Sequence, residues 1–462
     1  MARLASVPHP AAADARTRLA EAVAARLAQS QPDDEDRVEQ VEVAVEPCDA
    51  LGWLAAQPHA PKSYWRSRED GVTVAGVGAA DRIGGSMESA LEALQPKLGG
   101  LPPSVRYVGG LRFDPARAAD PEWKAFDAAR FVLPRVQLTV AADRATLAAH
   151  LVLPRDAQRS GRVMEEMGAL EAPDGTRRDT LPAPTTRTDA PGETGWQQGI
   201  ASVLKAIDDE ALEKAVLARR VTLDFEAPLD PLVLAHRLFA AAPACTHLLV
   251  QTRRGPAFVG ASPERLFRRS GDRLWSEAVA GTRPRSPSAA ADRSLRDELL
   301  RSDKDQREHG TVRDYLRAVL GPFCTSLDLD PEASEMRLAR GRHLYSGLRA
   351  RLRPGTRSLD LLRALHPTPA VGGTPTDDAL RLIRALEPFD RGWYAGAVGW
   401  IGRDEAEFAV GIRSGLVEPG EGGARLSLYA GAGIVQGSDP EAEWAEVEGK
   451  LSPFLHLFAP SR

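Results

Sequence analysis

The sequence has few cysteines, no long apolar run and no strong excess of either charge. Its three cysteines, Cys48, Cys245 and Cys324, lie far apart and form no Cys-x-x-Cys pair. A disulfide framework or a zinc site is therefore not expected, and a reducing, cytoplasmic location is favoured. No apolar segment approaches the roughly 18 residues that a membrane span needs. The Ala/Arg-rich N-terminus lacks the continuous apolar stretch of a secretory signal.

The charge balance excludes a further class of partner. The formal net charge is −5 over 462 residues, and the basic residues are spread along the chain without a Lys/Arg block. This distribution argues against binding to nucleic acid. A small anionic substrate would need a local positive site, built from a few Arg and Lys side chains or from a metal ion.

The first part of the chain, residues 1–195, carries no recognisable catalytic cluster. A Pro/Thr/Asp/Gly-rich stretch at 172–195 has the composition of a loop or linker and separates it from residues 196–460. The apolar spacing within the first part predicts helices over about the first 30 residues and over 86–98, and strands at 41–45, 72–77 and 131–140.

The second part alternates between strand and helix patterns without strict βαβ order, which favours an α+β fold. A Pro/Ser/Ala-rich segment at 283–293 is expected to be a mobile loop, and Asp439 and Pro440 are typical of the start of a final helix. Helices are predicted at 196–207 and 294–320, and strands at 215–223, 246–252, 274–280, 393–401, 408–417 and 425–432.

Two of these helices carry acidic faces. Asp305 and Glu308 share one face of the long helix, and Glu443, Glu446 and Lys450 share one face of the final helix. Two such faces in one domain suit Mg²⁺, which prefers oxygen ligands and usually takes one or two carboxylates. Spacing alone equally allows two solvated faces with a surface Glu446–Lys450 pair, which is the commoner situation.

Other features allow both a structural and a functional interpretation. The glycine runs at 371–374 and 430–434 could bring backbone N–H groups to a carboxylate or could simply form tight turns. Arg413 lies in a predicted apolar strand, where a salt bridge or a substrate carboxylate would satisfy it. Lys214 could act as a base if it is desolvated, although most lysines at strand starts do not. His366, between restricted residues in a His-Pro-Thr-Pro segment, has packing as its simplest role.

Read together and in order, eight segments resemble the chorismate-utilising enzymes, a family that includes isochorismate, salicylate, anthranilate and aminodeoxychorismate synthases. The resemblance extends from about residue 214 to 455, and the part before residue 195 matches weakly. The segments are EKAVLARR, FVGASPERLF, AVAGTRPR, SDKDQREHGTVRDYL, LHPTPAVGGTP, EPFDRGWYAGAVGW, FAVGIRSGL and LYAGAGIVQGSDPEAEWAEVEGKL.

The resemblance implies one large α+β domain, with residues 1–195 a divergent part of the same fold. It also implies two packed antiparallel sheets flanked by helices, with the site in a deep cleft. Glu308 and Glu446 would bind Mg²⁺, and Asp305 and Glu443 would support them. The substrate-binding residues would be Gly281, Thr282, His366, Ala370, Tyr394, Arg413, Gly431 and Lys450.

The chemistry of chorismate explains why these residue types fit. The substrate is a dianion, so a metal ion acting as a Lewis acid and basic side chains would both stabilise it. Replacing the C4 hydroxyl by water at C2 needs a base for the water and an acid for the departing hydroxyl. By resemblance, Lys214 would be the base and Glu264 the acid.

Two residues favour the isochorismate synthase branch. Lys214 is typical of members that use water rather than ammonia, and Ala370 stands where members that eliminate pyruvate tend to have threonine. No Leu-Leu-Glu-Ser segment or amidotransferase portion is present, so we expect a monomer that needs no amidotransferase partner. Salicylate synthase, an anthranilate-type synthase component and a non-catalytic chorismate-binding protein remain alternatives, and the product could feed menaquinone or siderophore synthesis.

Overall fold

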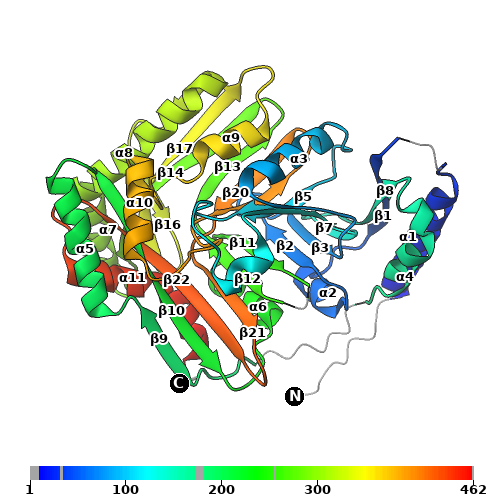
Figure 1. Cartoon of the computed structure of the whole chain (residues 1–462), viewed down its shortest axis with the longest axis horizontal. Helices are drawn as coiled ribbons and strands as arrows, with labels where there is room; N and C mark the ends of the chain where they lie inside the picture. The colour runs from blue at the N-terminus through cyan, green and yellow to red at the C-terminus, as the bar shows by residue number, and fades with distance from the viewer. Residues whose placement is uncertain (1–9, 32–34, 173–179, 254, 460–462) are drawn as a thin grey trace.

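The computed structural model describes residues 10–31, 35–172, 180–253 and 255–459. Two antiparallel sheets, of 12 and 10 strands, form its framework (Figure 1). Side chains from both sheets share one continuous hydrophobic core. The expected α+β fold with two packed antiparallel sheets and flanking helices is confirmed.

The larger sheet combines strands from both parts of the chain, because β2 pairs with β11 near its middle. In sheet order its strands are β1 (Arg37–Val45), β8 (Ala145–Leu153), β7 (Val136–Val140), β3 (Thr73–Val77), β2 (Lys62–Arg66), β11 (Thr246–Gln251), β12 (Ala257–Ser262), β21 (Ser414–Pro419), β22 (Ala424–Ile434), β10 (Lys214–Phe225) and β18 (Gly373–Thr374), and β9 (Thr186–Ala190) also pairs with β10.

The smaller sheet is mixed in the same way, because β5 pairs with β19. In sheet order its strands are β15 (Cys324–Leu329), β17 (Gly341–Leu352), β14 (Arg273–Pro284), β13 (Arg265–Ser270), β20 (Glu405–Val410), β19 (Ala397–Ile401), β5 (Tyr107–Leu111), β6 (Ala129–Leu133) and β4 (Asp81–Gly85), and β16 (Ser334–Arg337) also pairs with β17.

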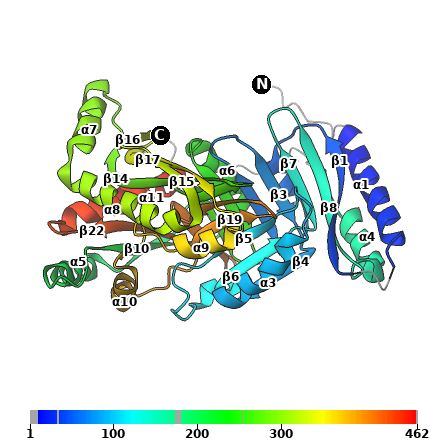
Figure 2. The ribbon, with the colours of Figure 1, turned by 90° about the horizontal axis from the view of Figure 1, so that it is seen from above.

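Figures 1 and 2 both show α1 and α4 at one end of the molecule and α5 and α10 at the other, while α2, α3, α6 and α9 lie between the two ends. Helix α8 packs on β14 and β17, and α11 packs on β22. The helices are α1 (Pro10–Ala28), α2 (Ala50–Ala56), α3 (Met87–Gly99), α4 (Ser160–Gly168), α5 (Glu193–Asp208), α6 (Pro231–Ala241), α7 (Ala289–Arg301), α8 (Asp303–Leu320), α9 (Ser358–Leu365), α10 (Thr376–Leu386) and α11 (Pro440–Leu455).

Local signals gave correct helix starts. The Asp439 side chain accepts a hydrogen bond from Ala442 N at 2.8 Å and Pro440 occupies the first turn of α11, as expected. Ser86 caps α3 in the same way, by accepting from Ser89 N at 3.2 Å. Such caps satisfy backbone donors that have no partner within the helix.

Three segments differ from their predicted structure. The expected helix 294–320 is two helices, because Ser302 ends α7 and also caps α8 by accepting from Asp305 N at 3.2 Å. The segment 283–293, expected to be a loop, contains the end of β14 and the start of α7. In the expected linker 172–195, residues 173–179 lie outside the described residues, and the rest includes β9 and the start of α5.

Two predicted strands are each divided between the two sheets. The run 131–140 is divided at Pro134, which cannot donate a ladder hydrogen bond, into β6 and β7. The run 408–417 is divided into β20 and β21, and Arg413 in the break adopts a φ of 51°. Arg413 therefore lies in the short segment that links the two sheets, and not in a strand.

Short segments carry the chain between the sheets in two similar pairs. In the N-terminal pair, residues 78–80 and 134–135 run side by side, since β3 pairs with β7 and β4 with β6. In the C-terminal pair, residues 263–264 and 411–413 do the same, since β12 pairs with β21 and β13 with β20.

Among the described residues, no helix is both long and apolar enough to span a membrane.

Candidate active site

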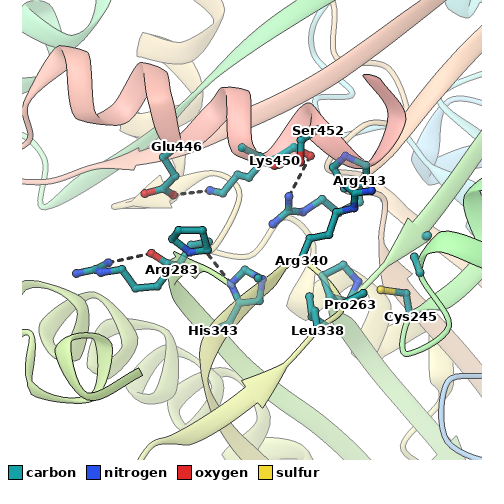
Figure 3. A pocket seen from close by; sticks show the side chains of 18 of the residues that line it. Cys245, Pro263, Arg283, Leu338, Arg340, His343, Arg413, Glu446, Lys450 and Ser452 are labelled. Atoms are coloured by element: carbon teal, nitrogen blue, oxygen red, sulfur yellow. Dashed lines mark hydrogen bonds and ion pairs between the residues drawn. The ribbon is translucent and has the colours of Figure 1, made fainter. Parts of the chain in front are cut away.

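A cavity of about 560 Å³ opens beside the C-terminal pair of crossing segments, between α8 and α11 (Figure 3). A smaller chamber of about 80 Å³ adjoins it and contains Glu264. The two spaces share five lining residues, so they form one outer and one inner compartment. The shared residues are Pro263, Thr282, His343, Arg413 and Lys450.

The paired crossing segments hold Glu264 and Arg413 next to each other, although they are far apart in the sequence. Val410 N donates to Glu264 O at 3.1 Å, and Ala261 N donates to Arg413 O at 3.0 Å. The Ser262 hydroxyl ties the same segments together by donating to Val410 O at 2.7 Å. The backbone therefore fixes both side chains at the junction of the two compartments.

The Glu264 carboxyl is adapted to carry a proton. Burial raises the pKa of Glu264 to about 8, Glu277 adds to the increase, and Lys214, Lys450 and Arg68 oppose it. A carboxylic acid with such a pKa stays protonated at neutral pH and can donate its proton. A raised pKa is what an acid role for Glu264 requires, and that role stays a prediction.

Arg413 and Lys450 form a basic wall between the compartments. Arg413 Nη1 donates to the carbonyl oxygen of Lys450 at 3.0 Å, and Lys450 Nζ donates to Gly431 O at 2.8 Å. The Arg413 guanidinium makes no ion pair with a carboxylate among the residues that the structure describes. It is therefore available to bind an anionic ligand.

The two acidic helix faces turn toward the outer compartment rather than toward bulk solvent. Asp305, Glu308, Glu443 and Glu446 all line it. Each is paired with a cation: Asp305 with Arg283 at 2.9 Å, Glu308 with Lys214 at 2.8 Å, Glu443 with Lys304 at 2.8 Å and Glu446 with Lys450 at 2.7 Å.

The pairing also keeps Glu446 ionised inside the cavity. Burial acts to raise the pKa of Glu446, but Lys450, aided by Lys304, outweighs it and lowers the pKa. A carboxylate that remains ionised while lining a cavity is a suitable ligand for a hard cation.

The donor set is compatible with Mg²⁺. Within the described part of the chain, no three His, Cys, Asp or Glu side chains converge to form a complete protein cage. Mg²⁺ usually does without one, because it takes one or two carboxylates together with water and substrate oxygens. The carboxylates of Glu308 and Glu446 match that requirement.

Lys214 begins β10 and is only 2% exposed. Its ammonium is bound to Glu308, and Lys214 itself is not among the lining residues of either compartment. Gly433 permits this arrangement, because a Cβ there would lie 2.7 Å from Glu308 Oε1 and 2.9 Å from Lys214 Cε. The structure thus brings Lys214 to the edge of the site through Glu308.

The two glycine runs have different roles. Gly431 lines the inner compartment and Gly433 the outer one. Gly373, by contrast, packs against β10 with a φ of 152°, and a Cβ there would lie 2.3 Å from Lys214 O. For the run 371–374, the geometry therefore supports close strand packing rather than binding of a ligand carboxylate.

Most of the other expected substrate residues also gather here, but His366 does not. Ala370 and Tyr394 line the inner compartment, and Thr282 lines both. Gly281 lies just behind Thr282, where its carbonyl oxygen accepts from His343 Nδ1 at 3.0 Å. His366 lines neither compartment, since it is buried with its Nε2 3.0 Å from Arg112 O, and burial lowers its pKa to about 4. This position fits the simpler packing role that the sequence allowed.

His343 is a cavity residue that the sequence did not reveal. Burial and the nearby Arg413 charge lower the pKa of His343 to about 3, so the ring is neutral. Its Nδ1 faces Gly281 O, and its buried Nε2 has no hydrogen-bond partner among the described residues. A lone histidine in a strand carries no sequence signal that would distinguish it from a core residue.

Comparison with known proteins places these residues in a family. The family described as "Chorismate binding enzyme" matches residues 24–459. The chain is 34% identical to isochorismate synthase 2, chloroplastic, of Arabidopsis thaliana over 98% of this chain and 85% of that protein. It is 37% identical to the salicylate biosynthesis isochorismate synthase of Pseudomonas aeruginosa over 76% of this chain and 74% of that protein.

A solved structure agrees over nearly the whole length. The menaquinone-specific isochorismate synthase MenF from Escherichia coli superposes with a TM-score of 0.83 and 30% sequence identity, covering 96% of this chain and 99% of that one. The similarity therefore includes the divergent N-terminal part as well as the segments around the cavity.

Proposed function

The chain belongs to the chorismate-binding enzyme family, and on that premise we propose that it is an isochorismate synthase, an isomerase. It converts chorismate reversibly to isochorismate by adding water at C2 and releasing the C4 hydroxyl. The observation that carries the proposal is the buried Glu264, whose pKa burial raises to about 8, in an inner compartment that it shares with Arg413 and Lys450.

Substrate binding rests on the basic wall. Arg413 presents a planar guanidinium and Lys450 an ammonium to the space between the compartments. A guanidinium can hold a carboxylate by two parallel hydrogen bonds, which fixes orientation as well as position. We infer that these two groups bind carboxylates of chorismate, while Tyr394, Gly431 and Thr282 shape the ring site.

Proton transfer rests on two groups with opposite requirements. Glu264 is protonated at neutral pH and would donate its proton to the departing C4 hydroxyl, which leaves as water. Lys214 would accept the proton of the water that attacks C2, and for this its amine must be neutral. Since Glu308 binds the Lys214 ammonium at 2.8 Å, that ion pair must loosen before Lys214 acts as a base.

We propose that Glu308 and Glu446 hold a Mg²⁺ ion, with support from Asp305 and Glu443, because their oxygen donors line one cavity. Bound there, the ion would neutralise a substrate carboxylate and withdraw electron density from the conjugated ring. A chelator should abolish turnover and added Mg²⁺ should restore it. Glu446→Gln should raise the Mg²⁺ concentration needed for half-maximal activity.

Retention of pyruvate is favoured by Ala370. Its methyl group lines the inner compartment beside Tyr394 and offers no hydroxyl there. The names of the relatives point to two uses of the product, menaquinone and salicylate synthesis, and the chain could serve either. We expect it to act in the cytoplasm as a monomer, without an amidotransferase subunit.

The test is product identification with purified protein, chorismate and Mg²⁺. Isochorismate should form reversibly, without free pyruvate and without the fluorescence of salicylate or anthranilate. A fluorescent product would support a lyase of the same family instead. Lys214→Ala should lose turnover while keeping the fold, and unchanged turnover in that variant would refute the proposed role of Lys214 as base.

A further inference from the structure

The charged residues that line the outer compartment do not balance. Its four carboxylates are each paired with a cation, through Arg283, Lys214, Lys304 and Lys450. Two guanidinium groups remain, those of Arg413 and Arg340, and neither makes an ion pair with a carboxylate in the described part of the chain. Because Lys214 reaches Glu308 from outside the lining, the described lining itself has five Arg and Lys side chains against four carboxylates. Arg413 and Arg340 are the two of these cations that no carboxylate of the described chain pairs with.

Arg340 is the outer member of this pair. It is exposed, whereas Arg413 is partly buried between the compartments. Figure 3 shows both side chains among the residues that line the cavity. Arg340 lies in the tight turn between β16 and β17, which is closed by Leu338 N donating to Gly341 O at 2.9 Å.

The backbone of this turn is firmly anchored, although the Arg340 side chain is not. Arg285 N donates to Arg340 O at 3.1 Å, and Arg285 Nη1 donates to Leu338 O at 3.2 Å. The next strand holds Arg342, which is 1% exposed and is ion-paired with Asp292 and, at 2.8 Å, with Glu335. The turn therefore presents Arg340 at a fixed place on the rim of the cavity.

The wall beside Arg340 is apolar. Leu338, Ala339, Pro263 and Cys245 line the same compartment, and burial raises the pKa of the Cys245 thiol to about 11, as expected for a poorly hydrated surface. A cation on the rim of an apolar wall suits an anion carried on a carbon ring better than a hydrated inorganic anion.

We propose that Arg340 forms, together with Arg413, an entry site that captures a carboxylate of the incoming substrate before it reaches the inner compartment. The ligand class is a carboxylate borne on a small apolar ring, and this inference rests on the proposed function for the identity of that ligand. A guanidinium at the mouth of a cavity attracts an anion from solution and can bind it by two N–H groups.

A residue that captures substrate and a residue that takes part in the reaction should affect the kinetic constants differently. An entry site acts on the encounter and on binding, so it changes kcat/KM and leaves kcat nearly unchanged. Its effect should weaken as salt increases, because salt screens exposed charges. A surface arginine without such a role would change neither.

Arg337 provides the matched control. It lies on β16, close to Arg340 in the sequence, and is exposed, but it does not line the cavity and makes no ion pair among the described residues. Arg340→Gln and Arg337→Gln therefore change the net charge of the protein equally and on the same hairpin, so a difference between them reports on position alone.

The experiment measures kcat and kcat/KM for the native protein and both variants over a range of ionic strength. Arg340→Gln should lower kcat/KM about tenfold at low salt, in the range of electrostatic steering, with kcat within about twofold. Its dependence on salt should become shallower, and Arg340→Lys should restore that dependence. Arg337→Gln should stay within about twofold of the native protein. Equal effects of the two Gln variants, or a loss confined to kcat, would overturn the proposal.

Equilibrium binding of chorismate, measured by calorimetry without turnover, separates this proposal from the proposed function. If the native protein binds chorismate but produces no isochorismate, the function fails, while weaker binding by Arg340→Gln alone would still support capture. If the native protein turns over normally and Arg340→Gln binds as tightly as Arg337→Gln, the entry site is wrong and the function stands. Absence of any binding would contradict both.

Discussion

The two pairs of crossing segments have the same topology, but the arginine in one is ion-paired within the protein and the arginine in the other is not. In the N-terminal pair, Arg135 is ion-paired with Asp156 at 2.6 Å and with Glu166 at 2.8 Å, and it also donates to His150 O at 2.7 Å. In the C-terminal pair, the Arg413 side chain makes a single hydrogen bond to the described residues, from Nη1 to the carbonyl oxygen of Lys450.

The space beside each pair follows the same contrast. The cavity next to Arg135 measures about 50 Å³, whereas the cavity next to Arg413 measures about 560 Å³. A buried charge is costly unless it is paired. At the N-terminal crossing, carboxylates of the protein pair with Arg135. At the C-terminal crossing, the Arg413 guanidinium and the protonated Glu264 carboxyl are left to interact with a ligand. Three substitutions and one pH titration test this contrast.

Removing the acid at the C-terminal crossing should have the largest effect. Glu264→Gln keeps the shape and neutral charge of the protonated carboxyl but cannot donate a proton as an acid, so kcat should fall by about 10²–10⁴-fold. The melting temperature should stay the same or rise. Turnover measured by chromatography, beside a thermal melt, checks both. Near-native turnover in a folded variant would remove Glu264 from the mechanism.

Removing the cation at the N-terminal crossing should affect stability instead. Arg135→Met removes the 2.6 Å partner of buried Asp156 and leaves it only the more distant Arg155, 3.9 Å away. The free energy of unfolding should therefore fall by about 3–5 kcal/mol. Activity per folded molecule should be retained. Denaturant unfolding gives the first quantity and active-site-normalised turnover the second. Arg135→Lys, which keeps the charge, should lose less stability, and equal loss in both variants would argue against the ion pairs.

The matching change at the C-terminal crossing should affect binding more than stability. Arg413→Met removes a guanidinium that no carboxylate of the described chain pairs with, so unfolding should change little. Truncating one partner of a charge pair with the substrate should cost about 2 kcal/mol or more in kcat/KM. Steady-state kinetics and a melt decide the matter: a large loss of stability with unchanged KM would make Arg413 a structural residue like Arg135.

The pH dependence should give a smaller but specific signal. Because the folded pKa of Glu264 is raised to about 8 from an ordinary value of 4.5, kcat/KM should decline above pH 8 as the proton is lost. Between these two values the folded state binds more protons than the unfolded state, so the stability that Glu264 contributes should decrease as the pH rises. The difference in unfolding free energy between native protein and Glu264→Gln, measured from pH 5 to 9, should show this decrease. A flat difference would mean that Glu264 is ionised.

Local features of the fold could be predicted from the sequence, and long-range ones could not. Helix starts such as Asp439 and Ser86 depend on hydrogen bonds within a few residues. The divisions at Pro134 and Arg413 were missed because apolar residues resume soon after each interruption. The change of sheet itself depends on pairing with distant strands.

The site shows the same limit. The i, i+3 spacing of Asp305 and Glu308 predicted a shared face, but nothing in the spacing showed that Lys214 would bind Glu308 across 94 positions. Resemblance supplied Glu264 and Arg413 as separate motifs, and only the paired crossing segments show why they are neighbours. No sequence pattern around Arg340 or His343 marks them as cavity residues. What distinguishes them appears only in the folded chain: among the described residues, Arg340 has no ion pair and His343 Nε2 has no hydrogen-bond partner.

The fate of solvent oxygen tests water addition in this cavity most directly. Purified protein is incubated with chorismate and Mg²⁺ in H₂¹⁸O, and the product is analysed by mass spectrometry. Water addition at C2 predicts isochorismate that carries one solvent oxygen at C2, with no pyruvate released. Isochorismate without solvent oxygen, or a product that has lost pyruvate, would contradict water addition in this cavity.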